Sequence, residues 1–154
     1  MLTLGVLSSG QLGFKTLERL TSKYEVKFVL TDNNSTDIIT LIKEKNIPCY
    51  VGNPRNGKAY NFIKNIKIDV IVSINYLFLL ENDIISHPQK LIFNIHGSLL
   101  PKYRGRTPHV WAIINGENKA GITAHVLDEG CDTGKIIEQI EVSIEHEDTG
   151  ATIL

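Results

Sequence analysis

The opening stretch of the chain decides its fold class. Residues 2–31 are LTLGVLSSGQLGFKTLERLTSKYEVKFVLT. The apolar run Leu2–Leu7 predicts a buried strand, and leucines at near-helical spacing predict a helix over about Leu12–Thr21. The Val- and Phe-containing run Tyr24–Thr31 predicts a second strand. A strand, a helix and a strand in this order form the unit from which parallel sheets are built.

The same alternation continues along the chain. Further strands are predicted over Cys49–Val51, Asp69–Ile74, Leu91–Ile95, Gly121–Leu127 and Lys135–Val142, and helices around Ile38–Ile42, Tyr60–Ile66 and Thr107–Asn115. Such crossover connections predict an α/β fold with a Rossmann-like, open, mostly parallel sheet and helices on both faces. In these sheets the ligand binds beyond the carboxyl ends of the strands. No internal repeat or linker interrupts the pattern, so one domain is expected.

Composition and charge argue against several classes of protein. The chain has 154 residues, of which 42% are hydrophobic and 21% charged, and its formal net charge is −1. Such a charge balance gives no basis for sequence-independent binding to nucleic acid. The most apolar stretch, Val70–Leu80, is too short to span a bilayer. Cys49 and Cys131 match neither a disulfide framework nor a metal-binding pair. We therefore expect no nucleic-acid or membrane partner, no metal, and a cytoplasmic location.

The turn Ser8–Gly13 joins the first predicted strand to the first helix. Backbone N–H groups at the start of that helix, including that of Gly10, could hold the phosphate of a substrate. A tight turn that simply requires glycine is the alternative, and the sequence leaves both open. The turn is not GxGxxG, which disfavours an NAD-dependent enzyme of the Rossmann type.

Candidate catalytic residues concentrate in residues 93–109, FNIHGSLLPKYRGRTPH. Asn94 and His96 are two positions apart at the end of a predicted strand, so both side chains share one face at the ligand crevice. An amide can hydrogen-bond an oxyanion and an imidazole can exchange protons near neutral pH, so the pair suits acyl transfer. The alternative is that both side chains only satisfy loop backbone. The Gly- and Pro-containing loop that follows favours a functional site.

A second polar segment is the acidic turn over residues 128–134, DEGCDTG. On composition alone it could be a hairpin turn whose Asp side chains bond their own backbone. That interpretation is the prediction for Asp128.

Four motifs together resemble the 10-formyltetrahydrofolate-dependent formyltransferases. They are Asn94-Ile95-His96, Ser98-Leu99-Leu100-Pro101, Tyr103-Arg104-Gly105 and Asp132-Thr133-Gly134. Gly121–His125 and Asp148-Thr149-Gly150 also resemble segments of that family. The similarity covers about Ile92–Thr152, and the first half of the chain matches only in the order of its strands and helices. The resemblance implies a folate-dependent formyltransferase, with 10-formyltetrahydrofolate as co-substrate.

The resemblance also implies roles for individual residues. Asn94 would hold the formyl oxygen as it becomes an oxyanion, His96 would assist with that charge or with proton movement, and Asp132 would orient His96 and shuttle protons. The folate would lie in an apolar slot beside the backbone of a turn. The matching positions are Leu79, Leu80, Ile84, Ile85, Ile92, Glu129, Gly130 and Cys131, the apolar ones being equally suited to a core. No metal or covalent intermediate is required.

The acceptor amine separates the branches of this family. The run Arg104–Ile113 most resembles enzymes that formylate the amino group of nucleotide-linked sugars. Lys102, Arg104 and Arg106 would then meet the diphosphate, and His109 would face the sugar, unless these basic residues only hold the loop. Glycinamide ribonucleotide and methionyl-tRNA are the alternative acceptors, and a non-catalytic folate- or nucleotide-binding remnant is the alternative of another class.

Two further expectations complete the prediction. His125 is expected to be structural. Residues 1–154 are expected to be a formyltransferase catalytic domain that lacks its C-terminal elements, because Asp148-Thr149-Gly150 would cap a helix just where the sequence stops. The resemblance leaves a homodimer open.

Overall fold

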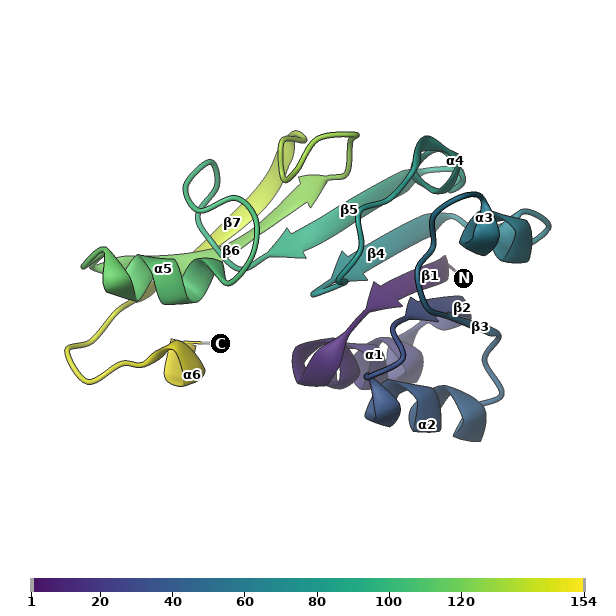
Figure 1. Cartoon of the computed structure of the whole chain (residues 1–154), viewed down its shortest axis with the longest axis horizontal. Helices are drawn as coiled ribbons and strands as arrows, with labels where there is room; N and C mark the ends of the chain where they lie inside the picture. The colour runs from purple at the N-terminus through teal and green to yellow at the C-terminus, as the bar shows by residue number, and fades with distance from the viewer. Residues whose placement is uncertain (1, 154) are drawn as a thin grey trace. The chain divides into compact units, whose positions relative to one another are not determined.

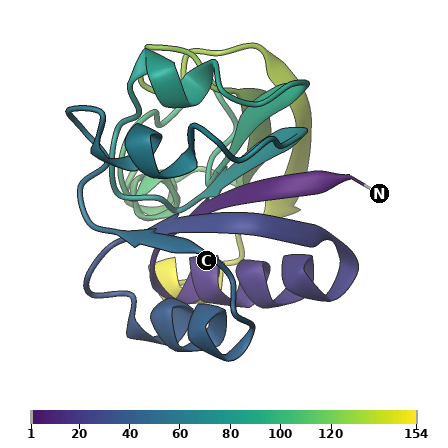
Figure 2. The same ribbon diagram turned by 90° about the vertical axis from the view of Figure 1, so that its right-hand side faces the viewer.

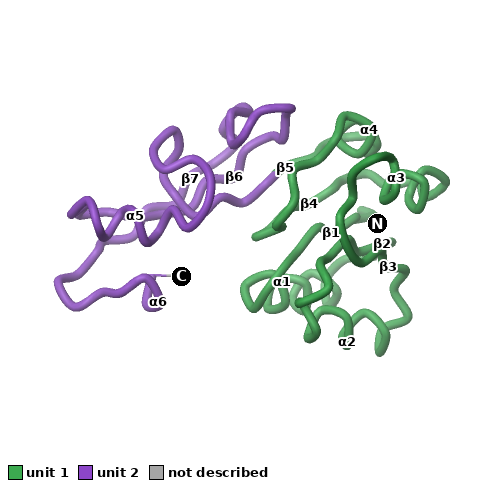
Figure 3. The backbone as a smooth tube through the Cα atoms, in the orientation of Figure 1, with its two compact units in different colours: residues 1–93 green, residues 94–154 purple. Residues whose placement is uncertain are grey.

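The chain divides into two compact units, and in the first unit strands alternate with helices. The computed structural model describes residues 2–153 and separates residues 1–93 from residues 94–154, drawn in different colours in Figure 3. Within the first unit, the sheet order is β3-β2-β1-β4-β5. These strands are β1 (Thr3–Ser8), β2 (Glu25–Thr31), β3 (Cys49–Val51), β4 (Val70–Ile74) and β5 (Leu91–His96), of which the last continues into the second unit.

The helices of the first unit cover both faces of its sheet. They are α1 (Gly10–Lys23), α2 (Thr36–Glu44), α3 (Lys58–Ile63) and α4 (Asn82–Ile85). Figures 1 and 2 show α1 and α2 on one side of strands β1 and β2, and α3 and α4 on the other. The crossover connections produce this arrangement, because the chain moves outward from β1 to β3 and then returns across the sheet to β4 and β5.

The central strands of this unit are parallel and buried. Val6 of β1 lies opposite Val29 of β2 on one side and Val72 of β4 on the other. All three side chains are at most 5% exposed. Apolar runs without alternating polar residues are typical of strands that helices cover on both faces. The predicted Rossmann-like, mostly parallel α/β sheet is therefore confirmed.

The observed elements differ from the predicted ones at the ends of helices and strands, and one short helix was not predicted. Helix α1 begins at Gly10, two residues before its predicted start, and ends at Lys23. Helix α4 was not predicted, because it has only four residues and one buried side chain, Ile84, too few to show a helical period. The Ser35 hydroxyl makes no capping bond to α2. It donates instead to Asp32 Oδ2 at 2.6 Å and accepts the Gly10 N–H at 2.9 Å.

Gly5 of β1 gives a direct test of packing in the first unit. It lies opposite Phe28 of β2, and a Cβ built on Gly5 would lie 2.4 Å from the Phe28 ring. Because Phe28 is fully buried, Gly5→Ala must displace the ring, and we expect a loss of about 1–3 kcal/mol in unfolding free energy. Urea unfolding measures this loss. In the background Phe28→Leu, Gly5→Ala should cost less, and an equal cost in both backgrounds would contradict the steric explanation.

The second unit is built on an antiparallel hairpin. Its sheet order is β5-β6-β7, with β6 (Lys119–Val126) and β7 (Ile136–Ser143) antiparallel to each other. Helix α5 (Pro108–Ile114) packs against β6 and against α6 (Gly150–Ile153). On β6, Thr123 and His125 are buried, whereas Ile122 is 43% exposed. Side chains alternate between the two faces of a strand, so one face of β6 points into the interior of the unit.

Helix length bears on the predicted absence of a membrane partner. A transmembrane helix needs about 20 apolar residues. Helix α1 has 14 residues, and in residues 2–153 no helix combines the length and apolar character that a membrane span requires.

Candidate active site

The end of β5 carries Asn94 and His96, as the sequence predicted. Asn94 is half-buried and His96 is 6% exposed. His96 Nε2 lies 2.7 Å from the backbone oxygen of Tyr103. Because a carbonyl can only accept a hydrogen bond, Nε2 carries the proton. The other ring nitrogen, Nδ1, lies 3.5 Å from Asp132 Oδ2. The loop after β5 thus orients the imidazole toward Asp132.

Asp132 is the centre of this polar cluster. Its Oδ2 accepts the Gly105 N–H at 2.9 Å, and its Oδ1 lies 3.3 Å from His125 Nε2. The Asp132 backbone is left-handed, with φ of 53°, a conformation that Asp and Asn tolerate better than most residues. Gly134 permits the tight return of the chain, since a Cβ there would lie 1.7 Å from the Val126 carbonyl oxygen. One carboxylate therefore contacts two imidazoles and one loop amide.

The electrostatics of the cluster keep Asp132 ionised. Burial would raise its pKa, but the hydrogen bonds from His125 and Gly105 and the nearby charge of His96 lower the pKa to about 2. The same contact acts on His125 in the opposite direction. The hydrogen bond with Asp132 raises the pKa of His125, although burial opposes the rise. An anionic Asp132 at neutral pH suits a group that orients imidazoles and stabilises their charged forms.

His125 is the site residue whose part the sequence underestimated. The sequence predicted a structural residue, and His125 is buried in β6 with 1% exposure. Yet its Nε2 lies 3.3 Å from Asn94 Nδ2 as well as from Asp132 Oδ1. Alternation along β6 places Thr123 and His125 on one buried face of the strand, but it does not indicate which residues they contact. Thr123 holds the loop that follows β5, because its hydroxyl donates to Ser98 O at 2.7 Å.

The predicted diphosphate-binding residues divide into two groups. Lys102 Nζ contacts both carboxylate oxygens of Glu117, at 2.9 and 3.1 Å, and Tyr103 OH donates to Glu117 Oε1 at 2.8 Å. Lys102 therefore takes part in holding the loop. Arg104 and Arg106 are exposed, and the structure gives neither of them a hydrogen bond or ion pair within residues 2–153. Their guanidinium groups are available to an anion.

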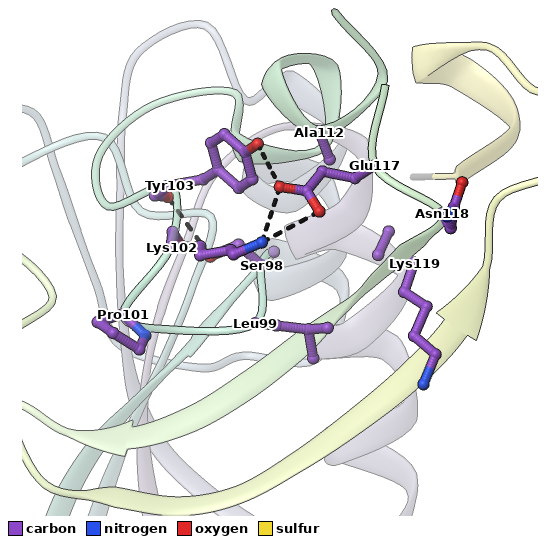
Figure 4. Close-up of a pocket in the computed structure, with 11 residues that line it drawn as sticks. Ser98, Leu99, Pro101, Lys102, Tyr103, Ala112, Glu117, Asn118 and Lys119 are labelled. Atoms are coloured by element: carbon purple, nitrogen blue, oxygen red, sulfur yellow. Dashed lines mark hydrogen bonds and ion pairs between the residues drawn. The ribbon is translucent and has the colours of Figure 1, made fainter. Parts of the chain in front are cut away.

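A cavity of about 490 Å³ lies beside this loop (Figure 4). Leu99, Ala112 and Ala120 give it an apolar lining, and the Lys102–Glu117 pair stands at its edge. None of Asn94, His96 and Asp132 lines the cavity. The cavity and the predicted catalytic cluster are thus separate features of the second unit.

The other predicted binding residues lie in different environments. In the first unit, Ile84 and Ile92 belong to the core, Leu80 and Ile85 are half-buried, and Leu79 is 59% exposed. In the second unit, Glu129, Gly130 and Cys131 are exposed in the turn before Asp132, and His109 is half-buried in α5. The backbone of the exposed turn is accessible to a folate. Ile84 and Ile92 are buried, so they are less suited to direct contact with it.

The surroundings of Gly10 and of Cys131 each limit the chemistry that these residues can perform. Gly10 has a left-handed backbone with φ of 63°, and its N–H is engaged by Ser35 Oγ. This geometry is that of a tight turn needing glycine, the alternative to a phosphate site. Burial and the neighbouring Asp132 raise the pKa of the Cys131 thiol, which disfavours a nucleophilic thiolate. Across the described part of the chain, no group of three or more His, Cys, Asp or Glu side chains is arranged to hold a metal ion.

Comparison with known protein families identifies the family to which this chain belongs. The family model described as Formyl transferase matches residues 7–154. The chain therefore belongs to the formyl transferase family, and the family predicted from the sequence is confirmed.

Two curated relatives come from different branches of that family. The bifunctional polymyxin resistance protein ArnA of Wigglesworthia glossinidia brevipalpis is 37% identical over 149 residues, which are 93% of this chain and 22% of ArnA. The methionyl-tRNA formyltransferase of Thermodesulfovibrio yellowstonii is 43% identical over 103 residues, which are 65% of this chain and 33% of that enzyme. The chain thus spans a third or less of the length of these relatives.

Solved structures share the fold. A phosphoribosylglycinamide formyltransferase from Bacillus halodurans has a TM-score of 0.84 and 31% identity, over 98% of this chain and 84% of that one. WlaRD, a sugar 3N-formyl transferase solved with dTDP and 5-N-formyl-THF, has a TM-score of 0.79 and 24% identity, over 99% of this chain and 56% of its own. At that identity, the similarity to WlaRD concerns the fold alone.

Proposed function

We propose that this chain transfers a formyl group from 10-formyltetrahydrofolate to the amino group of an acceptor, with Asn94, His96 and Asp132 at the reacting centre. The observation that carries the proposal is the contact of the Asp132 carboxylate with His96 and His125, beside the Asn94 amide. Membership of the formyl transferase family supports it. The folate is a substrate of this reaction, so no resident cofactor is invoked.

The residues of the cluster meet the demands of formyl transfer. The neutral amine attacks the formyl carbon, and the carbonyl oxygen becomes an oxyanion that the Asn94 amide N–H can stabilise. The amine nitrogen then loses a proton, and the folate nitrogen gains one as the bond between it and the formyl carbon breaks. His96 Nδ1 can accept the proton, and the ionised Asp132, whose Oδ2 lies 3.5 Å from Nδ1, stabilises the imidazolium that forms. Protons and electrons balance without a metal or a covalent enzyme intermediate.

We infer that the acceptor is the amino group of a nucleotide-linked sugar. Arg104 and Arg106 are exposed and unpaired among the described residues, and a guanidinium binds a diphosphate by paired hydrogen bonds. The run Arg104–Ile113 also resembles the enzymes that formylate nucleotide-linked sugars. A glycinamide ribonucleotide acceptor is the second candidate, because the Bacillus halodurans enzyme is 31% identical over nearly the whole chain. Methionyl-tRNA is the third, on the relative that is 43% identical.

A panel of acceptors tests both parts of the proposal. The purified chain is mixed with 10-formyltetrahydrofolate and, separately, with amino-sugar nucleotides, glycinamide ribonucleotide and methionyl-tRNA. Tetrahydrofolate release is followed by absorbance and the formylated product by mass spectrometry. We expect the highest kcat/KM with a sugar nucleotide.

Each of the other outcomes contradicts a different part of the proposal, either the acceptor or the transfer reaction itself. Transfer to glycinamide ribonucleotide or methionyl-tRNA alone would overturn the acceptor and leave formyl transfer standing. Binding of 10-formyltetrahydrofolate without transfer to any acceptor would overturn the enzymatic proposal and favour a folate-binding remnant. Tetrahydrofolate release without a formylated acceptor would indicate hydrolysis in place of transfer.

A further inference from the structure

The ring of His125 makes three contacts that cannot all be optimal in one protonation state. Nδ1 lies 3.0 Å from the Val126 backbone oxygen. Nε2 lies 3.3 Å from Asn94 Nδ2 and 3.3 Å from Asp132 Oδ1. Because the Val126 oxygen can only accept, Nδ1 carries a proton in either state. The charge of the ring therefore decides whether Nε2 donates or accepts.

In the neutral ring, Nε2 is an acceptor. It can then receive an N–H from Asn94 Nδ2, but its lone pair faces the anionic Asp132 Oδ1, which is unfavourable. In the charged ring, Nε2–H donates to Asp132 Oδ1. If Asn94 Nδ2 kept its position 3.3 Å from Nε2, the N–H groups of the amide and of the ring would both be donors and would repel each other. Turning the Asn94 amide by half a rotation removes the conflict, because its Oδ1 then accepts from Nε2–H. The oxygen and nitrogen of an amide have nearly the same size, so the turn changes only the hydrogen bonding.

We propose that protonated His125 sets the orientation of the Asn94 amide, holding Asn94 Oδ1 and thereby directing the Nδ2–H groups toward the formyl oxygen. The inference rests on the oxyanion role of Asn94 in the proposed function. With neutral His125, the amide binds the ring through Nδ2 and presents Oδ1 to the formyl oxygen, where it repels the developing oxyanion. His125 is thus a positioning residue that acts through Asn94.

The surroundings of His125 favour the charged form. Asp132 in the turn contacts Nε2, and Asp128 in the same turn adds a weaker attraction. From β5, the His96 ring faces His125 edge-on with centroids 6.5 Å apart, and its charged form would oppose protonation of His125. On the neighbouring strand β7, the residue opposite His125 is the uncharged Ile136. Contact with Asp132 raises the pKa of His125 against the effect of burial. The Asn94 amide is therefore held in the productive orientation when the pH is below the pKa of His125, and it loses this orientation as the pH rises through that pKa.

Nuclear magnetic resonance tests the orientation without requiring activity. The imidazole nitrogens of His125 and the side-chain NH₂ of Asn94 are followed from pH 5 to 9 in the ¹⁵N-labelled chain, with the Asn94 signals assigned by their loss in Asn94→Ser. We expect the two Asn94 N–H resonances to shift with the same midpoint as His125 Nε2. Asn94 resonances that stay constant while His125 titrates would overturn the proposal, whether or not the chain transfers formyl groups.

Kinetics provide a second test through His125→Gln. The amide NH₂ of the introduced glutamine can donate to Asp132 and to Asn94 at every pH, so kcat should stay within about tenfold of wild type and lose its fall at alkaline pH. His125→Leu offers no donor and should lower kcat about 100-fold with little change in KM, as for loss of an oxyanion donor. His146→Gln, at an exposed histidine, should keep the wild-type profile. A wild-type alkaline fall in folded His125→Gln would overturn the coupling.

Discussion

Asp132→Asn is expected to lower kcat/KM for formyl transfer by about 1,000-fold, within the range of general acid–base groups. The substitution keeps the shape of the side chain and tolerates the left-handed backbone, which has φ of 53°. An amide, however, offers one acceptor oxygen where the carboxylate offers two. It therefore cannot accept from Gly105 through one oxygen and from His125 through the other. Steady-state kinetics with the acceptor that the panel selects measure the effect.

The control for this variant is Glu141→Gln. Glu141 is an exposed carboxylate of β7 that pairs with Lys119 Nζ at 2.7 Å. The same loss of charge at this position should leave kcat/KM within about twofold, since exposed ion pairs contribute little. Transfer by Asp132→Asn at more than a tenth of the wild-type rate would contradict a role for Asp132 in proton movement.

The stability of Asp132→Asn gives an additional readout that needs no substrate. The pKa of Asp132 is lowered from 3.8 to about 2 in the folded chain. A depressed pKa stabilises the fold above the unfolded value, and this stabilisation is lost as the pH falls from about 4 to 2. The difference in unfolding free energy between wild type and variant should therefore shrink over that acidic interval. It should also decline as the pH rises through the pKa of His125, because Asp132 raises that pKa and the variant lacks this interaction.

The fold was largely predictable because its signals are local. The apolar run at the start of the chain and the short strand Cys49–Val51 are continuous in sequence, and β3 has the predicted bounds. Crossover rules then supply the parallel sheet from the order of elements alone. The short helix α4 escaped prediction because one turn with a single buried side chain has no period to detect.

The candidate site was predictable only where neighbours in sequence are neighbours in space. Alternation along β5 indicated that Asn94 and His96 share a face, and motif similarity added Asp132. Contact of Asp132 with His125 depends on the return of the chain at Gly134, which no local pattern encodes. The position of Lys102 shows the same limit. Its charge suggested a diphosphate, but a partner 15 residues away, Glu117, binds it instead.

Asn94→Ala is the second variant with a large expected effect. If the Asn94 amide stabilises the oxyanion, its loss removes an interaction that is strong only in the transition state. We expect kcat to fall about 100- to 1,000-fold while KM changes little, as for other oxyanion donors. Single-turnover formation of the formylated acceptor isolates the chemical step. Asn61→Ala, at an exposed asparagine of α3, should retain wild-type values of both constants.

Asn94→Asp separates the charge of the side chain from its size. The carboxylate has the shape of the amide but no N–H, and it would add a second anion next to His125 Nε2, which lies 3.3 Å from the Asn94 amide nitrogen. Two anions beside this ring would raise the pKa of His125 further and repel the oxyanion, so kcat should fall at least as far as in Asn94→Ala. If both variants raised KM and left kcat unchanged, Asn94 would act in substrate binding. In that case the oxyanion would need another donor, and the orientation of the amide by His125 would have no effect on the chemical step.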